Sequence, residues 1–189
     1  PEQSVSRPTA DRFRRLTGKR AQGIPLAYLT GHKEFFGLDF IVNRHVLVPR
    51  PETETLVELT LDQLQNAECS LPAGKAGMQN IVLIDVGTGS GCIPISIIKS
   101  LKHKNIKSLK HVFATDISRR ALRVAKKNAT RHGVDITLLH GHLLPPILTP
   151  QHFNTSTLQH LFIPANLPYL TASQYSAEPT IQHEPKRAL

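Results

Sequence analysis

One stretch near the middle of the chain restricts the possible folds more than any other. Residues 81–86 form a continuous apolar run of the length of a buried strand, and the run ends in Gly-Thr-Gly-Ser-Gly at 87–91. An apolar segment of helical length follows at 93–101, with Pro94 in its first turn, where a helix tolerates proline. A strand, a glycine turn and a helix in this order are typical of a βαβ unit in a parallel sheet.

The sequence after this unit repeats the alternation. It predicts three further strands, at 111–114, 136–140 and 161–165. A helix is expected to begin after Ser118, a favourable N-cap, and to end near Arg131. Its inner face is expected to carry Leu122, Ala125 and Ala129. The predicted fold is therefore α/β, with a Rossmann-like parallel sheet flanked by helices.

The sequence before residue 81 predicts smaller elements. Residues 11–22 indicate the end of a basic helix, and 34–36 with 40–42, separated by Gly37, indicate a β-hairpin. A helix is expected over 52–67, with one apolar face formed by Val57, Leu61 and Leu64. Residues 69–80 are small and polar and contain Gly and Pro, so they indicate a loop.

Composition excludes several classes of protein. In 189 residues, 40% are hydrophobic and 20% are charged, which excludes intrinsic disorder, and the longest apolar runs are far shorter than a membrane span. The two cysteines, Cys69 and Cys92, form neither a disulfide framework nor a zinc site, so a reducing, cytoplasmic setting is expected. His140 and His142 have the spacing of one strand face but lack a recognisable third ligand, so the sequence predicts no metal site.

The net charge of +9 is concentrated in one region. Residues 99–131 hold eleven Lys and Arg against one acid, Asp116. Such a basic face suits an anionic partner, such as nucleic acid or an acidic protein surface. It is equally typical of a solvated helical face that keeps a protein soluble, so charge alone decides nothing.

The glycine-rich turn is the first candidate site. Glycines at 87, 89 and 91 allow a tight turn and the close approach of a ligand to the helix N-terminus. The spacing differs from both the dinucleotide fingerprint and the phosphate loop. Asp116 ends the next strand, where an acid accepts hydrogen bonds from ribose hydroxyls. Together these residues indicate a nucleoside-bearing cofactor at the carboxyl ends of the strands.

The second candidate site is Asn-Leu-Pro-Tyr at 166–169, directly after the last predicted strand. The side-chain carbonyl of Asn166 and the backbone carbonyl before Pro168 can both accept hydrogen bonds from one planar NH₂ group. This would point the nitrogen lone pair toward an electrophile, while Tyr169 stacks on the planar substrate. Alignment of the two reactants would then supply most of the catalysis.

These motifs resemble those of class I methyltransferases that use S-adenosylmethionine to methylate an amide or amino nitrogen. The upstream sequences 23–31, 34–40 and 46–57, the last containing Pro-Arg-Pro-Glu-Thr-Glu, are similar to HemK-type release factor glutamine methyltransferases. The segment 183–189 matches the one that follows the Asn-Pro-Pro-Tyr motif of that family. The resemblance covers about residues 15–189 and implies a longer parent protein, truncated at both ends. It divides the chain into the end of an N-terminal helical domain (1–22), a β-hairpin linker (23–50) and a partial methyltransferase domain (51–189).

The resemblance also implies residue roles. Six residues would hold the methionine and ribose parts of S-adenosylmethionine: Gly87, Thr88, Gly89, Ser90, Gly91 and Asp116. Leu143 would contact the adenine, and Asn166 lies beside the cofactor as well as the substrate. Asn166 and the Leu167 carbonyl would hold the glutamine of the Gly-Gly-Gln motif in peptide chain release factors. Pro168 and Tyr169 would shape the slot, so that Asn166, Pro168 and Tyr169 form the catalytic set.

Two departures from the family keep alternatives open. Leu167 replaces the first proline of the family motif, and Asn-Leu-Pro-Tyr resembles ribosomal RNA adenine N(6)-dimethyltransferases, which would also account for the basic face. Those enzymes lack the Pro-Arg-Pro-Glu-Thr-Glu segment, so nucleic acid is the less favoured partner. His142 stands where an acid usually precedes the adenine contact. With the truncation, these departures leave a third interpretation, an inactive remnant that retains the binding fold.

Overall fold

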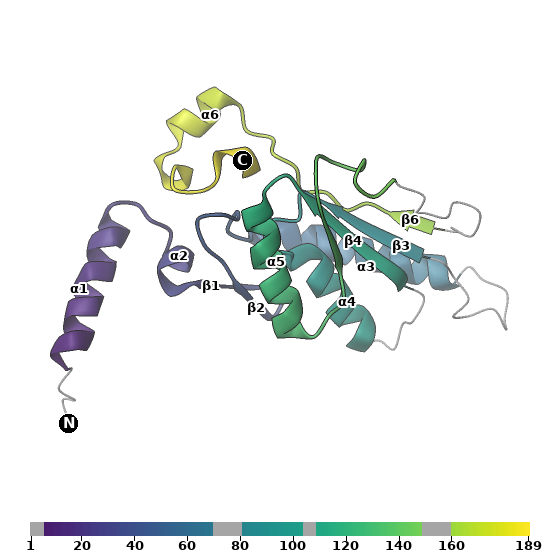
Figure 1. Cartoon of the computed structure of the whole chain (residues 1–189), viewed down its shortest axis with the longest axis horizontal. Coiled ribbons are helices and arrows are strands. Elements are labelled where there is room, and N and C mark those ends of the chain that lie inside the picture. Colours follow the sequence, from purple (N-terminus) through teal and green to yellow (C-terminus); the bar gives the residue numbers. More distant parts are fainter. Residues whose placement is uncertain (1–5, 70–80, 104–108, 149–159) are drawn as a thin grey trace.

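A parallel β-sheet forms the centre of the molecule. The structure is a computed structural model, and it describes residues 6–69, 81–103, 109–148 and 160–189. In these residues the sheet has the order β5-β4-β3-β6, and its strands are β3 (Ile81–Val86), β4 (Leu109–Asp116), β5 (Thr137–His140) and β6 (His160–Phe162). Helix α4 (Cys92–His103) connects β3 to β4, and α5 (Arg119–His132) connects β4 to β5 (Figure 1). The predicted α/β fold with a parallel sheet is confirmed.

The central strand β3 is buried on both faces, as its apolar run predicts. Ile81 and Leu83 belong to the main apolar cluster, which also contains residues of α3 (Glu54–Cys69), α4 and α5. Val82 and Ile84 point the opposite way and pack around Ile147. This alternation is the two-residue period of a strand, and it places the main core between the sheet and the helices.

The predicted hairpin is present, but its strands begin and end one or two residues earlier than predicted. Strands β1 (His32–Phe35) and β2 (Leu38–Ile41) are antiparallel, and the turn consists of Phe36 and Gly37, with φ values of 51° and 69°. Two positive φ angles are typical of the tight hairpin turn that matches strand twist. The Glu54 carboxylate accepts a hydrogen bond of 2.9 Å from the Phe36 N–H, which connects this turn to the start of α3.

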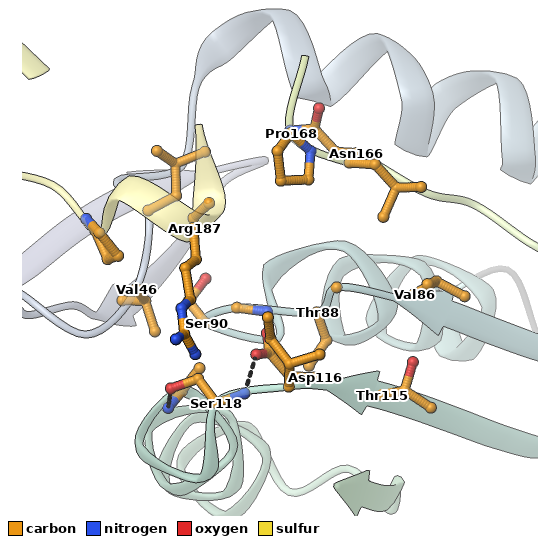
Figure 2. Close-up of a pocket in the computed structure, with 18 of the residues that line it drawn as sticks. Val46, Val86, Thr88, Ser90, Thr115, Asp116, Ser118, Asn166, Pro168 and Arg187 are labelled. Atoms are coloured by element: carbon orange, nitrogen blue, oxygen red, sulfur yellow. Dashed lines mark hydrogen bonds between the residues drawn. The ribbon is translucent and has the colours of Figure 1, made fainter. Parts of the chain in front are cut away.

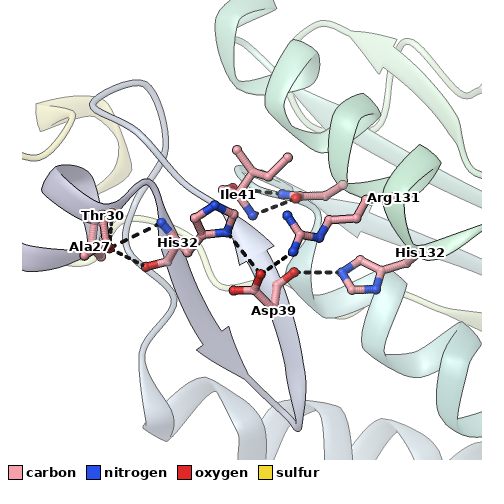
Figure 3. A network of polar contacts seen from close by, with 8 residues as sticks. Ala27, Thr30, His32, Asp39, Ile41, Arg131 and His132 are labelled. Atoms are coloured by element: carbon pink, nitrogen blue, oxygen red, sulfur yellow. Dashed lines mark hydrogen bonds and ion pairs between the residues drawn. The ribbon is translucent and has the colours of Figure 1, made fainter.

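Polar contacts connect the hairpin to the end of α5 (Figure 3). The Asp39 carboxylate lies 3.0 Å from the His32 ring and 2.5 Å from the Arg131 guanidinium, and the Asp39 carbonyl lies 3.0 Å from the His132 ring. In the same interface, the buried side chain of Asn128 forms hydrogen bonds with the N–H and the carbonyl of Ile41. The linker is thereby held against the helix that follows β4.

The inner face of α5 was predicted only in part. Its buried residues are Ala121, Val124, Ala125, Asn128 and Ala129. Ala125 and Ala129 are buried as predicted, whereas Leu122 is only partly buried. Leu122 is rotated by about 100° from Ala121 around the helix axis and therefore lies at the margin of the buried face.

The last strand is shorter than predicted. β6 ends at Phe162, so the expectation that Pro164 lies within the strand was wrong. A proline has no N–H to donate to a ladder, and here its carbonyl accepts a hydrogen bond of 3.4 Å from Val86. Among the described strands β6 pairs with β3 alone, so it is an edge, as expected. Beyond β6, Ala165 forms an isolated parallel bridge with Val86, so the chain continues beside the end of β3.

The last residues of the described chain pack against the linker. Helix α1 (Arg7–Ala21) has no buried residue, and the short α2 (Leu26–Thr30) follows it. Beyond β6, the sequence did not predict α6 (Ala172–Ala177) or the 3-10 turns η2 (Pro179–Ile181) and η3 (Lys186–Ala188). The buried carboxylate of Glu184 pairs with Arg50 and accepts a hydrogen bond of 2.9 Å from the Val48 N–H. These contacts hold the last residues against the segment that precedes the 3-10 turn η1 (Pro51–Thr53) and α3. Figure 1 shows that the C-terminus lies beside α6.

Two further sequence expectations concern the regions between elements. The predicted loop 69–80 lies outside the described residues except for Cys69, which ends α3. None of the helices in the described segments has the length and apolarity that crossing a membrane requires.

Candidate active site

A cavity of about 600 Å³ lies at the carboxyl ends of the strands (Figure 2). This volume is within the range of about 300–1,000 Å³ that is usual for small-molecule sites. Nine residues singled out from the sequence line it: Gly87, Thr88, Gly89, Ser90, Asp116, Leu143, Asn166, Leu167 and Pro168. The parallel strands bring these residues together because their carboxyl ends share one edge of the sheet.

The glycine turn forms the floor of the cavity. Gly87 and Gly89 have φ angles of 74° and 55°, a backbone region that side chains disfavour. A Cβ placed on Gly89 would meet nothing closer than the Gly87 carbonyl at 4.0 Å, so a side chain there would enter open space. Gly91 does not line the cavity. A Cβ on it would lie 3.2 Å from Ile95 and 3.3 Å from Ala125, so its role is close helix packing.

The Asp116 carboxylate is fixed at the cavity by two backbone donors. One oxygen accepts a hydrogen bond of 2.9 Å from Gly89, and the other accepts one of 2.7 Å from Ser118. Because each carboxylate oxygen has a second lone pair, both can accept a further hydrogen bond. The geometry suits a ligand with vicinal hydroxyls, and this is the chemistry predicted for Asp116.

Several polar atoms beside the cavity are buried without a partner among the described residues. They are the hydroxyls of Thr88 and Thr115, which line the cavity, and the carboxylate oxygens of Asp85. Burial raises the pKa of Asp85 to about 7, and the Asp116 charge adds to this rise. The Thr88 hydroxyl opposes it from nearby, although its geometry falls short of a hydrogen bond to the carboxylate. Unpaired buried polar groups are rare because they are costly, so these hydroxyls indicate a site built for a polar ligand.

The Asn-Leu-Pro-Tyr segment closes the opposite side of the cavity. The Asn166 amide nitrogen donates a hydrogen bond of 3.2 Å to the Thr53 hydroxyl. The Leu167 side chain lies 3.4 Å from where a Cβ on Gly87 would be, so it covers the glycine turn. Tyr169 does not line this cavity; it is 79% exposed and borders a second, smaller one.

The second cavity, of about 220 Å³, lies on the other side of Asn166. Thr53, Asn166 and Leu167 line both cavities, and Glu52 and Tyr169 line the smaller one only. Asn166 therefore stands at the boundary between a larger and a smaller binding space.

The predicted adenine contact, Leu143, has an unusual backbone. Its φ is 53°, which is rare for a leucine, and its side chain is 43% exposed at the cavity. Just before it, the Gly141 N–H donates a hydrogen bond of 3.1 Å to the Asp116 carbonyl. A Cβ on Gly141 would lie 2.2 Å from the Pro146 ring, so only glycine fits this turn. His142, between the two, also lines the cavity.

Sequence reasoning did not assign the segments that complete the wall. Residues 185–188 line the larger cavity, and Arg187 points into it in Figure 2. His45 of the linker and Thr53 of η1 also line this cavity. The sequence offers only the opposite charges of Glu184 and Arg50 as an indication that these segments meet. The two residues are too far apart in sequence for this pairing to be predicted.

Cys92 borders the cavity and has the character expected of a packing residue. Its side chain is buried, and this burial raises the pKa of the thiol to about 12. A thiol with such a pKa stays protonated near neutral pH and is a poor nucleophile. Cys92 therefore packs at the start of α4, as the sequence indicated.

Comparison with known proteins identifies the family. The family model described as ribosomal protein L11 methyltransferase (PrmA) matches residues 58–152. The chain belongs to this methyltransferase family. It is 36% identical over 179 residues to a release factor glutamine methyltransferase of Bacillus anthracis, with 94% of this chain and 56% of that protein covered. The corresponding protein of Moorella thermoacetica is 36% identical over 191 residues, with 100% and 59% covered.

The chain spans about half the length of these curated relatives. It is also similar to the crystal structure of a ribosomal protein L11 methylase from Lactobacillus delbrueckii, with a TM-score of 0.35 and 30% identity over 50% of this chain and 40% of that one. The matches confirm the resemblance to release factor glutamine methyltransferases and the class I methyltransferase fold. They also confirm S-adenosylmethionine as the cofactor that this family implies. The roles of individual residues stay predictions.

Proposed function

We propose that this chain transfers a methyl group from S-adenosylmethionine to the side-chain amide nitrogen of the glutamine in the Gly-Gly-Gln motif of peptide chain release factors. The observation that carries the proposal is the place of Asn166 between the two cavities, with its nitrogen directed to Thr53 and its oxygen left without a partner among the described residues. The names of the relatives support this choice of substrate.

The larger cavity fits S-adenosylmethionine. Its glycine cradle leaves space that a side chain would fill, and the unpaired hydroxyls of Thr88 and Thr115 offer polar contacts. In this proposal Asp116 accepts the ribose hydroxyls, and Leu143 packs on the adenine. Ser90 and the glycine turn enclose the rest of the cofactor. When bound, S-adenosylmethionine supplies an electrophilic methyl group on a sulfonium.

The substrate amide would enter from the smaller cavity. Asn166 Oδ1 and the Leu167 carbonyl, to which no described residue donates, accept its two N–H bonds. Pro168 and the exposed ring of Tyr169 confine the amide plane. An amide nitrogen is a poor nucleophile, so holding its lone pair toward the methyl group is the main contribution these residues make.

One observation favours a second candidate, methylation of an adenine amino group in RNA. His45 lines the larger cavity, and its pKa is lowered first by burial and then by the charges of Arg120, Arg44 and Arg123. These arginines make the surroundings of His45 strongly cationic, and part of this charge belongs to the 99–131 basic face. Such a surface attracts a phosphate backbone.

A labelled-methyl transfer assay tests the two candidates together. The chain is incubated with labelled S-adenosylmethionine and, in parallel, with a release factor or with ribosomal RNA. Label on the release factor that is lost when its Gly-Gly-Gln glutamine is changed to alanine supports the first proposal. Label in RNA adenine instead supports the second. No label, with cofactor binding retained, contradicts both proposals for this chain and supports the third interpretation, an inactive remnant that retains the binding fold.

We also propose the division of the chain into 1–22, 23–50 and 51–189, and a cytoplasmic location. The division is supported by the exposed helix α1, the hairpin and the sheet, which follow one another in this order. A cytoplasmic location follows from the substrate proposed.

A further inference from the structure

The hydroxyl of Thr53 is the polar group that holds the Asn166 side chain. It lies at the boundary of the two cavities, 3.2 Å from Asn166 Nδ2. No other hydrogen bond of the Asn166 side chain occurs within the described residues. Without this contact, no hydrogen bond within the described residues would fix the rotation of the amide about its last single bond.

Thr53 itself is held firmly. Its N–H donates a hydrogen bond of 3.0 Å to the Arg50 carbonyl, and Arg50 pairs with the buried Glu184. On its other side Glu54 begins α3 and accepts the Phe36 N–H at 2.9 Å. Threonine is also stiff at its first side-chain torsion because it branches at Cβ. The hydroxyl is therefore presented from a rigid element, which precise positioning requires.

Only one orientation of the Asn166 side-chain amide lets every hydrogen bond of the proposed site pair a donor with an acceptor. When a substrate NH₂ group donates to Asn166 Oδ1, Nδ2 must point the other way, and there it meets the Thr53 hydroxyl. The hydroxyl can accept, because it has two lone pairs. With the Asn166 amide rotated by half a turn, Nδ2 would face the donor of the substrate, and two donors would oppose each other.

We infer that Thr53 is a positioning residue, which acts through Asn166 by accepting its amide hydrogen and keeping Oδ1 turned toward the substrate nitrogen. This inference rests on the proposed function for its catalytic consequence. The positioning itself is a property of the protein without cofactor or substrate.

Two substitutions separate positioning from packing. Thr53→Val keeps the shape and removes the acceptor, whereas Thr53→Ser keeps the hydroxyl and removes a methyl group. Thr55→Val, at an exposed site of α3, is the matched control for loss of a hydroxyl. In transfer assays we expect Thr53→Val to lower kcat about tenfold, the value of one ordinary hydrogen bond, with the KM for the cofactor changed less than twofold. Thr53→Ser and Thr55→Val should stay within about threefold of the parent chain.

The second readout needs no activity. In ¹⁵N-labelled protein, the side-chain NH₂ signals of Asn166 are assigned by their loss in Asn166→Ala. We expect one of the two protons to be shifted downfield and to exchange slowly in the parent chain and in Thr53→Ser, and both to resemble an exposed amide in Thr53→Val.

The outcomes distinguish the two proposals. Unchanged Asn166 signals in Thr53→Val, or a Thr53→Ser as impaired as Thr53→Val, overturn the role of Thr53. If the parent chain binds S-adenosylmethionine but methylates no glutamine, the proposed function fails, while the NMR comparison still decides whether Thr53 positions Asn166.

Discussion

Asn128 connects the hairpin to the glycine turn, and its replacement by alanine measures what that connection contributes to stability. The side chain is fully buried in α5. Its Oδ1 accepts a hydrogen bond of 2.8 Å from the Ile41 N–H, and its Nδ2 donates to the Ile41 carbonyl at 3.0 Å and the Ser90 carbonyl at 2.9 Å. One side chain thus joins β2, α5 and the cavity floor.

The expected loss follows from these three bonds. Each ordinary hydrogen bond contributes about 0.5–1.5 kcal/mol net, so three contribute about 3 kcal/mol. The Ser90 carbonyl loses its partner in a buried place, which raises the cost. Alanine recovers about 0.5 kcal/mol because it is the better helix former. Asn128→Ala should therefore lower the free energy of unfolding by about 3 kcal/mol.

Urea denaturation followed by circular dichroism measures this difference. Lys127→Ala is the matched control, since it changes the neighbouring, exposed residue of the same helix and should shift the free energy of unfolding by less than about 0.5 kcal/mol. An Asn128→Ala variant within 1 kcal/mol of the parent chain would refute the reasoning, because it would mean that the three bonds are replaced by water at no cost.

Three further predictions follow from the site. Asn166→Ala should reduce methyl transfer below detection while the Kd for S-adenosylmethionine, measured by calorimetry, stays within a few-fold; retained turnover would contradict its role. Gly141→Ala should lose about 1–3 kcal/mol of stability, seen as a lower Tm, because its Cβ would lie 2.2 Å from Pro146; an unchanged Tm would show that the turn adapts freely. Burial raises the pKa of Asp85 from 3.8 to about 7, so the folded state binds a proton that the unfolded chain has lost. The free energy of unfolding should therefore fall by about 3 kcal/mol between pH 5 and pH 8. Asp85→Asn should lack this fall in urea titrations at the two pH values, and an equal slope in both proteins would count against the burial argument.

The site residues that the sequence predicted are those that lie at the ends of regular strands. Gly87 directly follows β3, Asp116 ends the adjacent parallel strand β4, and Asn166 follows β6. Because parallel strands present their carboxyl ends at one edge, recognising the strands was enough to place these residues together. The fold class followed from the same alternation of strands and helices.

The part that escaped prediction depends on polar contacts between distant, irregular segments. Glu184 meets Val48 and Arg50 across more than 130 residues of sequence, and no periodicity marks such a contact. Asn128 escaped for a related reason. A polar residue in a basic helix is expected to be solvent-exposed. Asn128 is buried instead, because the backbone of the hairpin supplies its hydrogen-bond partners.

The substitution of leucine at 167 does not remove the chemistry of the site. In the proposed function the backbone carbonyl of residue 167 accepts the substrate hydrogen, and a leucine has the same carbonyl as a proline. Leucine lacks the fixed φ of proline, but its side chain packs over Gly87, which restrains the segment in another way. The two acceptors suit any planar NH₂ group, amide or adenine alike. The choice between them must therefore arise from the smaller cavity, where Glu52 and Tyr169 flank the approach to Asn166.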